Sequence, residues 1–299
     1  MMDRFTARVV PRRDRVACLR AFVLEHFDLG YLKSGPILDV AGGKGDLSWI
    51  MRNADGLDAV IIDPRRTNHS KLERTALWYT QHPAEREVQA HAGQALAALA
   101  LAPPFVAPRH IRVFLDAEFL AAFVHDSTSA TFTGWWARAG RRAEAGEGTK
   151  GHHQPIKCTS AEPVGRVADA VEAHNILTNA RLILGFHPDE ATEPCIDLAL
   201  ATKTPFVVCP CCVFPRQFPQ RRLDEHAVSS YGDFLRYLRK KHPRMRMGKL
   251  HFESKTTGSG RGQARNTVLY MLRSDFAGAP GSSEQGGPSR KRAKVVEST

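Results

Sequence analysis

The stretch Pro36-Ile37-Leu38-Asp39-Val40-Ala41-Gly42-Gly43-Lys44-Gly45-Asp46-Leu47-Ser48 decides the fold of this 299-residue chain. A short apolar run carries an acidic residue, a glycine-rich turn follows, and the next residues can begin a helix. This order predicts the strand–turn–helix corner at which doubly wound α/β proteins bind a nucleotide-like ligand. Glycine suits such a corner because it adopts backbone angles that other residues avoid and lets a ligand approach the main chain. The alternative is a tight turn that binds nothing.

A second acidic residue supports this interpretation. The run Ala59-Val60-Ile61-Ile62 ends at Asp63 and Pro64, which predicts a buried parallel strand. In doubly wound nucleotide-binding folds, an acidic residue about 20 positions after the glycine turn binds ribose hydroxyls. Asp63 is therefore the candidate ribose ligand, and the alternative is that its carboxylate caps the next helix.

Strands and helices alternate along most of the chain. We expect further strands at 111–116, 181–186 and 205–209, helices at 11–33, 65–79, 91–101, 164–180, 193–202 and 231–242, and a closing pair of strands at 250–253 and 266–272. This order predicts an α/β fold over residues 1–275, a Rossmann-like seven-stranded, mostly parallel sheet with helices on both faces and a terminal antiparallel strand.

Two segments depart from that pattern. Residues 126–162 are rich in glycine and arginine and are interpreted as an inserted, flexible loop. Within it, Trp135 and Trp136 lie close to several arginines, so they either stack on nucleic acid or dock the loop onto the core. Residues 276–299 are expected to form a disordered basic tail, because they contain few apolar side chains.

The charge of the chain favours a polyanionic partner. The formal net charge is +11 and the isoelectric point is about 9.6, which makes RNA the first candidate partner, while a basic protein without such a partner is the alternative. The basic cluster Arg290–Lys294 predicts nuclear import or, alternatively, only a charged tail.

The sequence disfavours a membrane-spanning, a secreted or a disulfide-linked protein. No run of 18 apolar residues occurs, so no membrane span is expected, and the first residues lack the apolar core of a secretion signal. The six cysteines form no spaced framework, so we expect reduced thiols and no disulfide-linked partner. The sequence does not indicate an oligomeric state.

Two predicted strand ends carry the second half of the candidate site. The first is Gly185-Phe186-His187-Pro188-Asp189, in which His187 and Asp189 are the candidate catalytic residues, able to position a substrate hydroxyl or amine and accept its proton. The alternative is that Asp189 or Thr192 caps the following helix while His187 packs against the cofactor.

The second strand end is Cys209-Pro210-Cys211-Cys212. Cys211 and Cys212 are predicted to line the substrate side of the pocket as small, soft side chains. Zinc ligation, completed by His152, His153 or Cys158, and a covalent cysteine nucleophile are the other two interpretations. No metal site is predicted.

The glycine turn resembles motif I of the class I S-adenosylmethionine-dependent methyltransferases, which reads acidic-x-Gly-x-Gly-x-Gly. Asp39, Ala41, Gly43 and Gly45 match this motif, with Ala41 in place of the first glycine. The alanine would adopt a positive φ there only at a cost. The resemblance extends over residues 30–272.

The resemblance implies that the cofactor is S-adenosyl-L-methionine and that the loop from Gly185 to Asp189 borders the transfer site. It assigns ribose binding to Asp63 and adenine recognition to Asp116, which follows the third predicted strand. The cofactor-binding residues that it implies are Asp39, Ala41, Gly42, Gly43, Gly45, Asp63, Asp116, Gly185 and Phe186.

A narrower pattern is similar to the eukaryotic tRNA 2′-O-methyltransferases of the position-4 type and related methyltransferases. It comprises the histidine-containing loop, the helix with Ala191, Thr192 and Asp197 to Leu200, and the Cys-Cys pair. This chain departs from that group in having His187-Pro188-Asp189-Glu190 for His-x-Cys-Gly, and Glu193-Pro194 interrupt the Ala-Thr-Asp run. The zinc modules of that group are not visible.

Together these features predict a methyltransferase that acts on RNA, either tRNA or rRNA. Arg236, Arg239 and Lys240, on a predicted helix, are candidate phosphate contacts. One alternative is a methyltransferase of a protein or small molecule. The other is an inactive methyltransferase fold that serves as a binding module.

Overall fold

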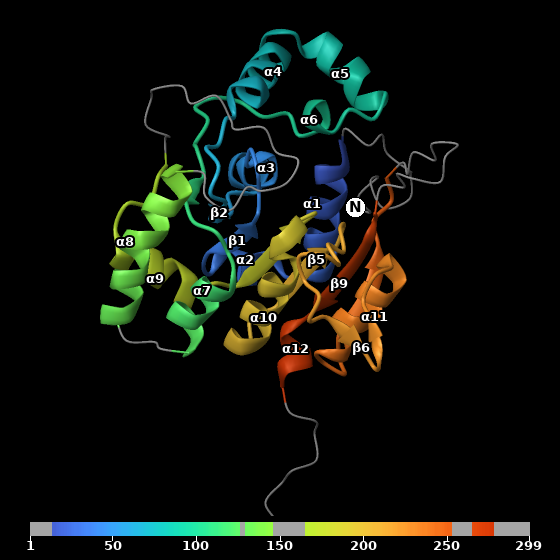
Figure 1. Ribbon diagram of the computed structural model, residues 1–299. Coiled ribbons are helices and arrows are strands. Elements are labelled where there is room, and N and C mark those ends of the chain that lie inside the picture. The colour runs from blue at the N-terminus through green and yellow to red at the C-terminus, as the bar shows by residue number, and fades with distance from the viewer. Residues whose placement is uncertain (1–13, 126–128, 146–164, 253–264, 278–299) are drawn as a thin grey trace, which may run out of the picture.

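The computed structural model describes residues 14–125, 129–145, 165–252 and 265–277. Its centre is a seven-stranded sheet in the order β3-β2-β1-β4-β5-β9-β8 (Figure 1). The strands are β1 (Ile37–Val40), β2 (Ala59–Ile62), β3 (Arg109–Ile111), β4 (Leu182–Phe186), β5 (Phe206–Cys209), β8 (Arg246–Lys249) and β9 (Thr267–Met271). A separate small hairpin joins β6 (Arg222–Leu223) to β7 (His226–Ala227).

The first five strands are parallel, and the sheet ends in antiparallel pairs. β9 pairs antiparallel with β5, and β8 pairs antiparallel with β9. The predicted fold class, an α/β protein with a mostly parallel seven-stranded sheet and an antiparallel end, is confirmed. The six-stranded sheet of dinucleotide-binding proteins has the order 3-2-1-4-5-6, whereas this seven-stranded sheet has β9 between β5 and the edge strand β8.

Helices cover both faces of the sheet. They are α1 (Arg15–His26), α2 (Leu29–Lys33), α3 (Asp46–Asp55), α4 (Ser70–Gln81), α5 (Pro83–His91), α6 (Ala95–Ala98), α7 (Ala117–Leu120), α8 (Ser129–Ala145), α9 (Ala170–Thr178), α10 (Thr192–Thr202), α11 (Tyr231–Lys240) and α12 (Arg273–Phe276). A π-helical turn at Ala121–His125 and a 3₁₀ turn at Asp189–Ala191 complete the described elements.

Side chains alternate between the two faces of each strand, and each face packs against a different set of helices. In β1, Leu38 and Val40 face a core built with α7 to α11, whereas Ile37 faces a second core built with α1 and α3. Successive side chains of a strand point to opposite faces, so a strand buried on both sides reads as a continuous apolar run. This is why β1 and β2 are recognisable in the sequence.

The strand order reverses direction at β1, which has β2 on one side and β4 on the other. Val40, the last residue of β1, is in register with Ile62 and with Gly185. The loops after β1, β2 and β4 therefore leave the sheet at the same edge. In open α/β sheets this is the crevice in which ligands bind.

A layer formed by α4, α5 and α6 lies beyond this edge, at the top of Figure 1. It packs on α3 through a third, smaller apolar cluster that includes Trp49, Ile50, Ala76 and Leu101. Because α4 follows β2, the layer is tied directly to the loop that carries Asp63.

Three sequence predictions are corrected. Residues 129–145, predicted as part of a flexible loop, form α8, with Phe132, Trp135, Ala139 and Ala143 buried. Their spacing of three or four residues is that of a helix face, which Gly134 and Gly140 obscure. Trp135 therefore docks on the core, as the alternative interpretation held.

The other two corrections concern strands. The penultimate strand is β8 at 246–249 rather than 250–253, because an edge strand with mostly exposed side chains lacks the apolar signal. β3 covers 109–111 rather than 111–116, since Val113 and Leu115 pack in the core after the backbone has left the sheet.

Several predictions fall outside the described residues. They are most of the tail at 276–299, the cluster Arg290–Lys294, and Cys158 with His152 and His153. The five cysteines that the structure describes are free. Among the described helices, none has the length and apolar character needed to cross a membrane.

Candidate functional site

The glycine turn between β1 and α3 has the backbone that its sequence predicts. Gly43 and Gly45 have φ values of 61° and 81°, and Ala41, at the position of the first motif glycine, has a φ of 52°. For a residue with a side chain this left-handed conformation costs roughly 1–2 kcal/mol. The turn therefore keeps its shape despite Ala41, at an energetic cost.

Two glycines of the turn are required by their neighbours. A Cβ on Gly42 would lie 2.8 Å from Oδ2 of Asp39. A Cβ on Gly45 would lie 2.3 Å from Cδ1 of Ile61 and 2.7 Å from Nε2 of His69. At these two positions there is no room for a methyl group, because Gly42 lies against Asp39 and Gly45 lies against β2 and the residue before α4.

Asp39 is buried beneath this turn, with 2% of its surface exposed. The hydroxyl of Ser48, in the first turns of α3, donates a hydrogen bond of 2.8 Å to its carboxylate. Burial raises the pKa of Asp39 to about 7, an effect that the Ser48 hydrogen bond partly offsets and the nearby charge of Asp63 reinforces. The carboxyl group can therefore be protonated in neutral solution.

Asp63 lies at the end of β2 and is 1% exposed. Its Oδ2 accepts a hydrogen bond of 2.8 Å from the backbone N–H of Gly43, which ties the loop after β2 to the glycine turn. The α4 helix begins at Ser70 with His69 as its N-cap residue, so Asp63 does not cap it.

Arg65 covers the remaining side of the Asp63 carboxylate. Its Nε and Nη2 atoms each lie 2.9 Å from a carboxylate oxygen, and its backbone N–H donates at 2.8 Å. This pairing raises the pKa of Arg65. Asp63 is thus a desolvated acceptor held by a guanidinium that is about one-third exposed. The sequence prediction did not include Arg65.

The loop after β4 has an unusual backbone. His187 and Asp189, on either side of Pro188, have φ values of 55° and 49°. The His187 N–H donates to the carbonyl of Cys209 in β5 at 3.1 Å, and the His187 ring contacts that of Phe186 with centroids 4.6 Å apart. Non-glycine residues in this region cost about 1–3 kcal/mol each and cluster at functional sites.

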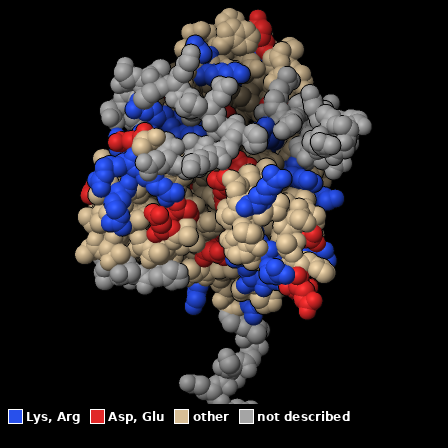
Figure 2. Space-filling view, viewed as in Figure 1, with Lys and Arg blue, Asp and Glu red and all other residues tan. Residues whose placement is uncertain are grey.

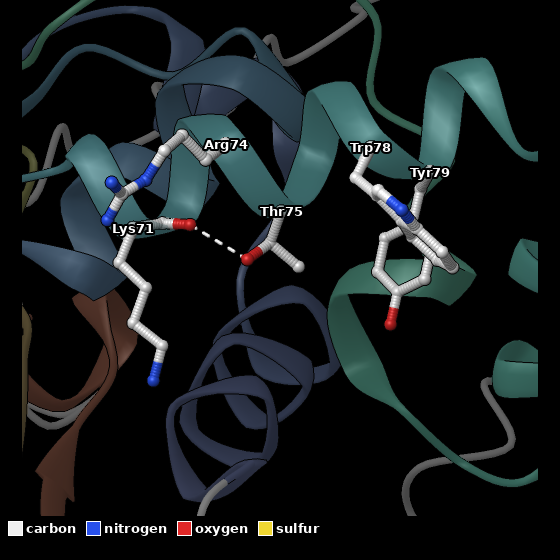
Figure 3. Close-up of a pocket in the computed structure, with 5 residues that line it drawn as sticks. All are labelled: Lys71, Arg74, Thr75, Trp78 and Tyr79. Carbon is white, nitrogen blue, oxygen red and sulfur yellow. Dashed lines mark hydrogen bonds between the residues drawn. The ribbon is translucent and has the colours of Figure 1, made fainter.

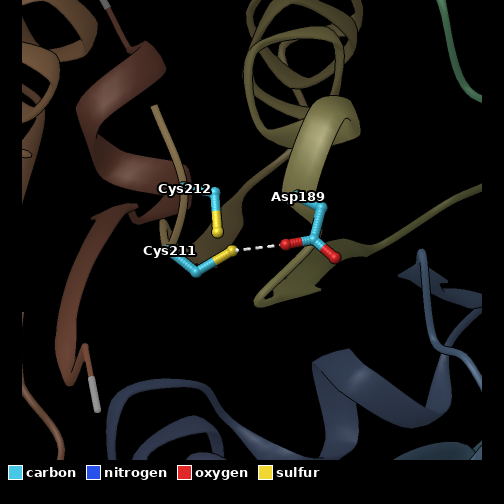
Figure 4. Close-up of side chains that lie close together, drawn as sticks. All are labelled: Asp189, Cys211 and Cys212. Atoms are coloured by element: carbon cyan, nitrogen blue, oxygen red, sulfur yellow. Dashed lines mark hydrogen bonds between the residues drawn. The ribbon is translucent and has the colours of Figure 1, made fainter. Parts of the chain in front are cut away.

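Asp189 points at the cysteine pair rather than at a helix end. Its Oδ1 accepts a hydrogen bond of 3.0 Å from Sγ of Cys211 (Figure 4). The N-cap of α10 is Ala191, which makes no side-chain cap, so Asp189 and Thr192 do not cap this helix through their side chains. The loops after β4 and β5 thus meet at Asp189, Cys211 and Cys212.

The two thiols of this cluster differ in acidity and in exposure. The hydrogen bond between them lowers the pKa of Cys212 and raises that of Cys211, and burial and the Asp189 carboxylate raise the Cys211 pKa further. Cys212 is exposed, whereas Cys211 is partly buried. Cys212 is therefore the more acidic and more accessible thiol.

The loop after β2 and the loop after β4 interact electrostatically. Asp189, after β4, lies close enough to Arg65, after β2, to raise its pKa. The glycine turn, Asp63, Arg65 and the loop from Gly185 to Asp189 therefore lie together at the carboxyl edge of β1, β2 and β4, although they are far apart in the sequence.

The carboxylate of Asp116 caps a helix and pairs with an arginine. It is the N-cap residue of α7, where it accepts a hydrogen bond from the Phe119 N–H, and it forms an ion pair of 2.5 Å with Arg142 of α8. Its assignment to adenine recognition stays a prediction.

The basic residues of α11 lie toward the far end of that helix. The hydroxyl of its first residue, Tyr231, donates a hydrogen bond of 3.2 Å to the carbonyl of Pro210, which follows β5. Further along, Arg236 pairs with Asp233 and Lys240 pairs with Asp224, while Arg239 is exposed. Acidic partners therefore offset part of the positive charge of α11, and its contact with substrate stays a prediction.

A surface hollow of about 320 Å³ on α4 is lined by Lys71, Arg74, Thr75, Trp78 and Tyr79 (Figure 3). His69 anchors the start of this helix against Gly45 of the turn. Sequence reasoning missed this surface, although the intervals of three and four residues between its members are those of one helix face.

Comparisons with models of protein families, with curated proteins and with solved structures found no match. The function of the chain is therefore inferred from its Rossmann-like α/β fold and from the residues of this site.

Proposed function

We propose that the chain is an S-adenosylmethionine-dependent methyltransferase that acts on RNA. The observation that carries this proposal is the buried Asp63 carboxylate, bonded to the Gly43 N–H where the strand order reverses. In doubly wound folds an acid at this place binds ribose hydroxyls. The turn lacks the third glycine of the dinucleotide fingerprint, with Ser48 at that position, which favours a nucleoside ligand over a dinucleotide.

The residues present fit such a cofactor. An added Cβ on Gly43 would approach only Nη2 of Arg65, at 3.4 Å, so the backbone there is accessible once that side chain moves. Ribose hydroxyls would replace the guanidinium donors on Asp63. S-adenosyl-L-methionine, when bound, supplies an electrophilic methyl group. Gly43 and Gly45 would contact it through their backbone, and Asp63 would hold its ribose.

In this proposal the loop after β4 orients the attacking group. His187 and Asp189 would hold a substrate hydroxyl or amine and accept its proton. The hydrogen bond from the His187 N–H to the carbonyl of Cys209 holds this loop rigidly against β5. Holding reactants in one geometry is itself a large part of catalysis in a group transfer of this kind.

The α4 surface supports RNA as the substrate. Lys71 and Arg74 lie on one side of the hollow and the rings of Trp78 and Tyr79 on the other (Figure 3). Basic side chains also appear over α4 at the top of Figure 2. Cations that neutralise phosphates, combined with an exposed aromatic ring on which a base can stack, are the features of single-strand binding surfaces. Trp78 is 43% exposed.

Calorimetric titration with S-adenosylmethionine tests the cofactor assignment. We expect saturable binding to the wild type and its loss in Asp63→Ala. The matched control is Asp224→Ala, because Asp224 is an exposed aspartate near the far end of α11. Absence of heat and of any spectroscopic change with the wild type would contradict the proposal, as would tighter binding of a nicotinamide dinucleotide.

RNA binding separates the proposal from its alternatives. Phosphate contacts require an affinity that falls as salt rises. Salt-independent or absent RNA binding together with cofactor binding would indicate a protein or small-molecule substrate. RNA binding without cofactor binding would indicate an inactive fold that serves as a binding module.

A nuclear location belongs to the same proposal and rests on Arg290–Lys294. A fluorescent fusion tests it, and replacement of these basic residues by alanine is expected to abolish nuclear accumulation.

A further inference from the structure

The cluster at the meeting point of the β4 and β5 loops contains three side chains that are metal ligands in other proteins. One oxygen of Asp189 and the Sγ atoms of Cys211 and Cys212 all lie within 4.8 Å of one another (Figure 4). Thiolates and carboxylates are two of the three ligand types that zinc prefers. The three atoms come from two loops, so a shared ion would join the carboxyl ends of β4 and β5.

The distances between the three ligand atoms are close to those in a zinc-bound site. Zinc bonds of about 2.3 Å to sulfur and about 2.0 Å to oxygen place tetrahedral ligand atoms roughly 3.5–3.8 Å apart. The Cys211 Sγ and Asp189 Oδ1 atoms are 3.0 Å apart, at hydrogen-bond distance. An ion between the three groups would therefore require only small rotations of side chains whose backbones are already held.

The surrounding charges suit an ion with these ligands. Two thiolates and one carboxylate carry three negative charges, so Zn²⁺ would leave the cluster with one. Arg65 interacts electrostatically with Asp189, and Arg265 does so with Cys212. Because Arg65 already pairs with Asp63, Arg265 is the group that would balance the remaining negative charge.

The backbone of the β4 loop also favours a bound ion. The left-handed conformations of His187 and Asp189 turn the Asp189 side chain away from the start of α10 and toward the cysteines. A strained loop of this kind persists when its surroundings hold it, and a metal bond is a strong form of such a restraint.

We propose that Asp189, Cys211 and Cys212 bind one Zn²⁺ ion, with the fourth position open to water or substrate. Three protein ligands with an open position are the arrangement of zinc sites that take part in chemistry, whereas structural sites have four protein ligands. The two thiolates select Zn²⁺ over Mg²⁺ and Ca²⁺, which prefer oxygen. This inference does not depend on the identity of the cofactor at the glycine turn. With Asp189 bound to the ion, His187 is the residue that would accept the proton in the proposed function.

The test measures the zinc affinity of the full-length reduced protein by competition with a chromophoric zinc indicator. We expect one equivalent of zinc per wild-type chain. We expect affinity to fall at least about tenfold in Cys212→Ser, since even loss of groups that only orient a ligand costs 10–100-fold. Co²⁺ should give sulfur-to-metal charge-transfer absorption in the wild type and weaker absorption in the variant.

Two further cysteine variants serve as controls. Cys18→Ser should bind zinc as the wild type does, because Cys18 lies in α1 and serine can keep its hydrogen bond to the His251 carbonyl. Cys158→Ser should also keep the ion, since the proposed site does not include Cys158. Circular dichroism and denaturation check that each variant is folded.

Two results would overturn the inference. One is a wild type that binds no more zinc than the Cys211→Ser/Cys212→Ser double variant. The other is a zinc affinity that Cys158→Ser abolishes and Cys212→Ser leaves unchanged. S-adenosylmethionine titration of the same samples keeps this outcome separate from the cofactor proposal, because Cys212 is not among the residues assigned to the cofactor.

Discussion

Nε2 of His69, the residue before α4, lies 2.7 Å from the place that a Cβ on Gly45 would occupy. Gly45 also has a φ of 81°, so both its conformation and its surroundings exclude a side chain. The glycine turn and the α4 layer are therefore packed against each other, and a change in one is expected to disturb the other.

The first prediction compares two glycines with positive φ. Gly45→Ala should lower the free energy of unfolding by more than about 2 kcal/mol, because strain and overpacking add. Gly56→Ala, at a φ of 64° with no atom within 4 Å of the added Cβ, should cost only the conformational penalty of about 1 kcal/mol. Denaturant unfolding measures both. Equal losses would show that the contact with His69 is not tight.

The second prediction concerns the pH dependence of stability. The pKa of Asp39 is raised from 3.8 to about 7 on folding, so between these values the folded state holds a proton that the unfolded chain has released. This contribution makes the free energy of unfolding fall as pH rises from about 4 to 7, by at most about 1.4 kcal/mol per pH unit, and leaves it constant above pH 7.

Asp39→Asn isolates this contribution, because the amide cannot ionise and its oxygen can still accept from Ser48. Across pH 4 to 7 the variant should gain stability relative to the wild type as pH rises. Parallel pH profiles for the two proteins would mean that Asp39 titrates normally.

The third prediction tests the α4 surface. Trp78→Ala should weaken binding of single-stranded RNA about fivefold to 150-fold, since stacking of one base is worth about 1–3 kcal/mol. Leu77→Ala is the matched control, because Leu77 has a similar exposure, 41% against 43%, on the same helix but no ring. Fluorescence anisotropy measures both affinities, and equal effects would remove Trp78 from the RNA surface.

The fourth prediction uses the charges of the same surface. The double variant Lys71→Ala/Arg74→Ala should bind RNA more weakly and with a shallower salt dependence. The slope of log K against log salt should fall by about 1.4, or 0.7 for each lost contact with a single strand. An Arg239→Ala/Lys240→Ala variant on α11 gives the comparison, and a larger change there would favour the basic residues predicted from the sequence.

The fifth prediction concerns α8. Trp135→Ala should destabilise the fold by about 3–5 kcal/mol, because this ring is 4% exposed and contacts Phe119 and Phe132. Trp136→Ala should cost less, since Trp136 is only partly buried, with its indole N–H bonded to the Ala168 carbonyl. Thermal unfolding distinguishes the two. A negligible loss in Trp135→Ala would support the flexible-loop interpretation.

The sequence by itself determined the parallel half of the sheet and the glycine turn at its carboxyl edge. Strands such as β1 and β2 are buried on both faces, so their apolar runs are visible without tertiary context. Gly43 and Gly45 are equally visible, because their positive φ favours glycine locally.

Only the tertiary structure decided what surrounds these residues. β8 is an exposed edge strand and has no apolar pattern, so its position depends on pairing with β9. Arg65 on Asp63, His69 against Gly45, and Asp189 beside Cys211 are contacts between loops that separate strands bring together. Such contacts depend on strand order and register, which a linear pattern of residue types does not contain.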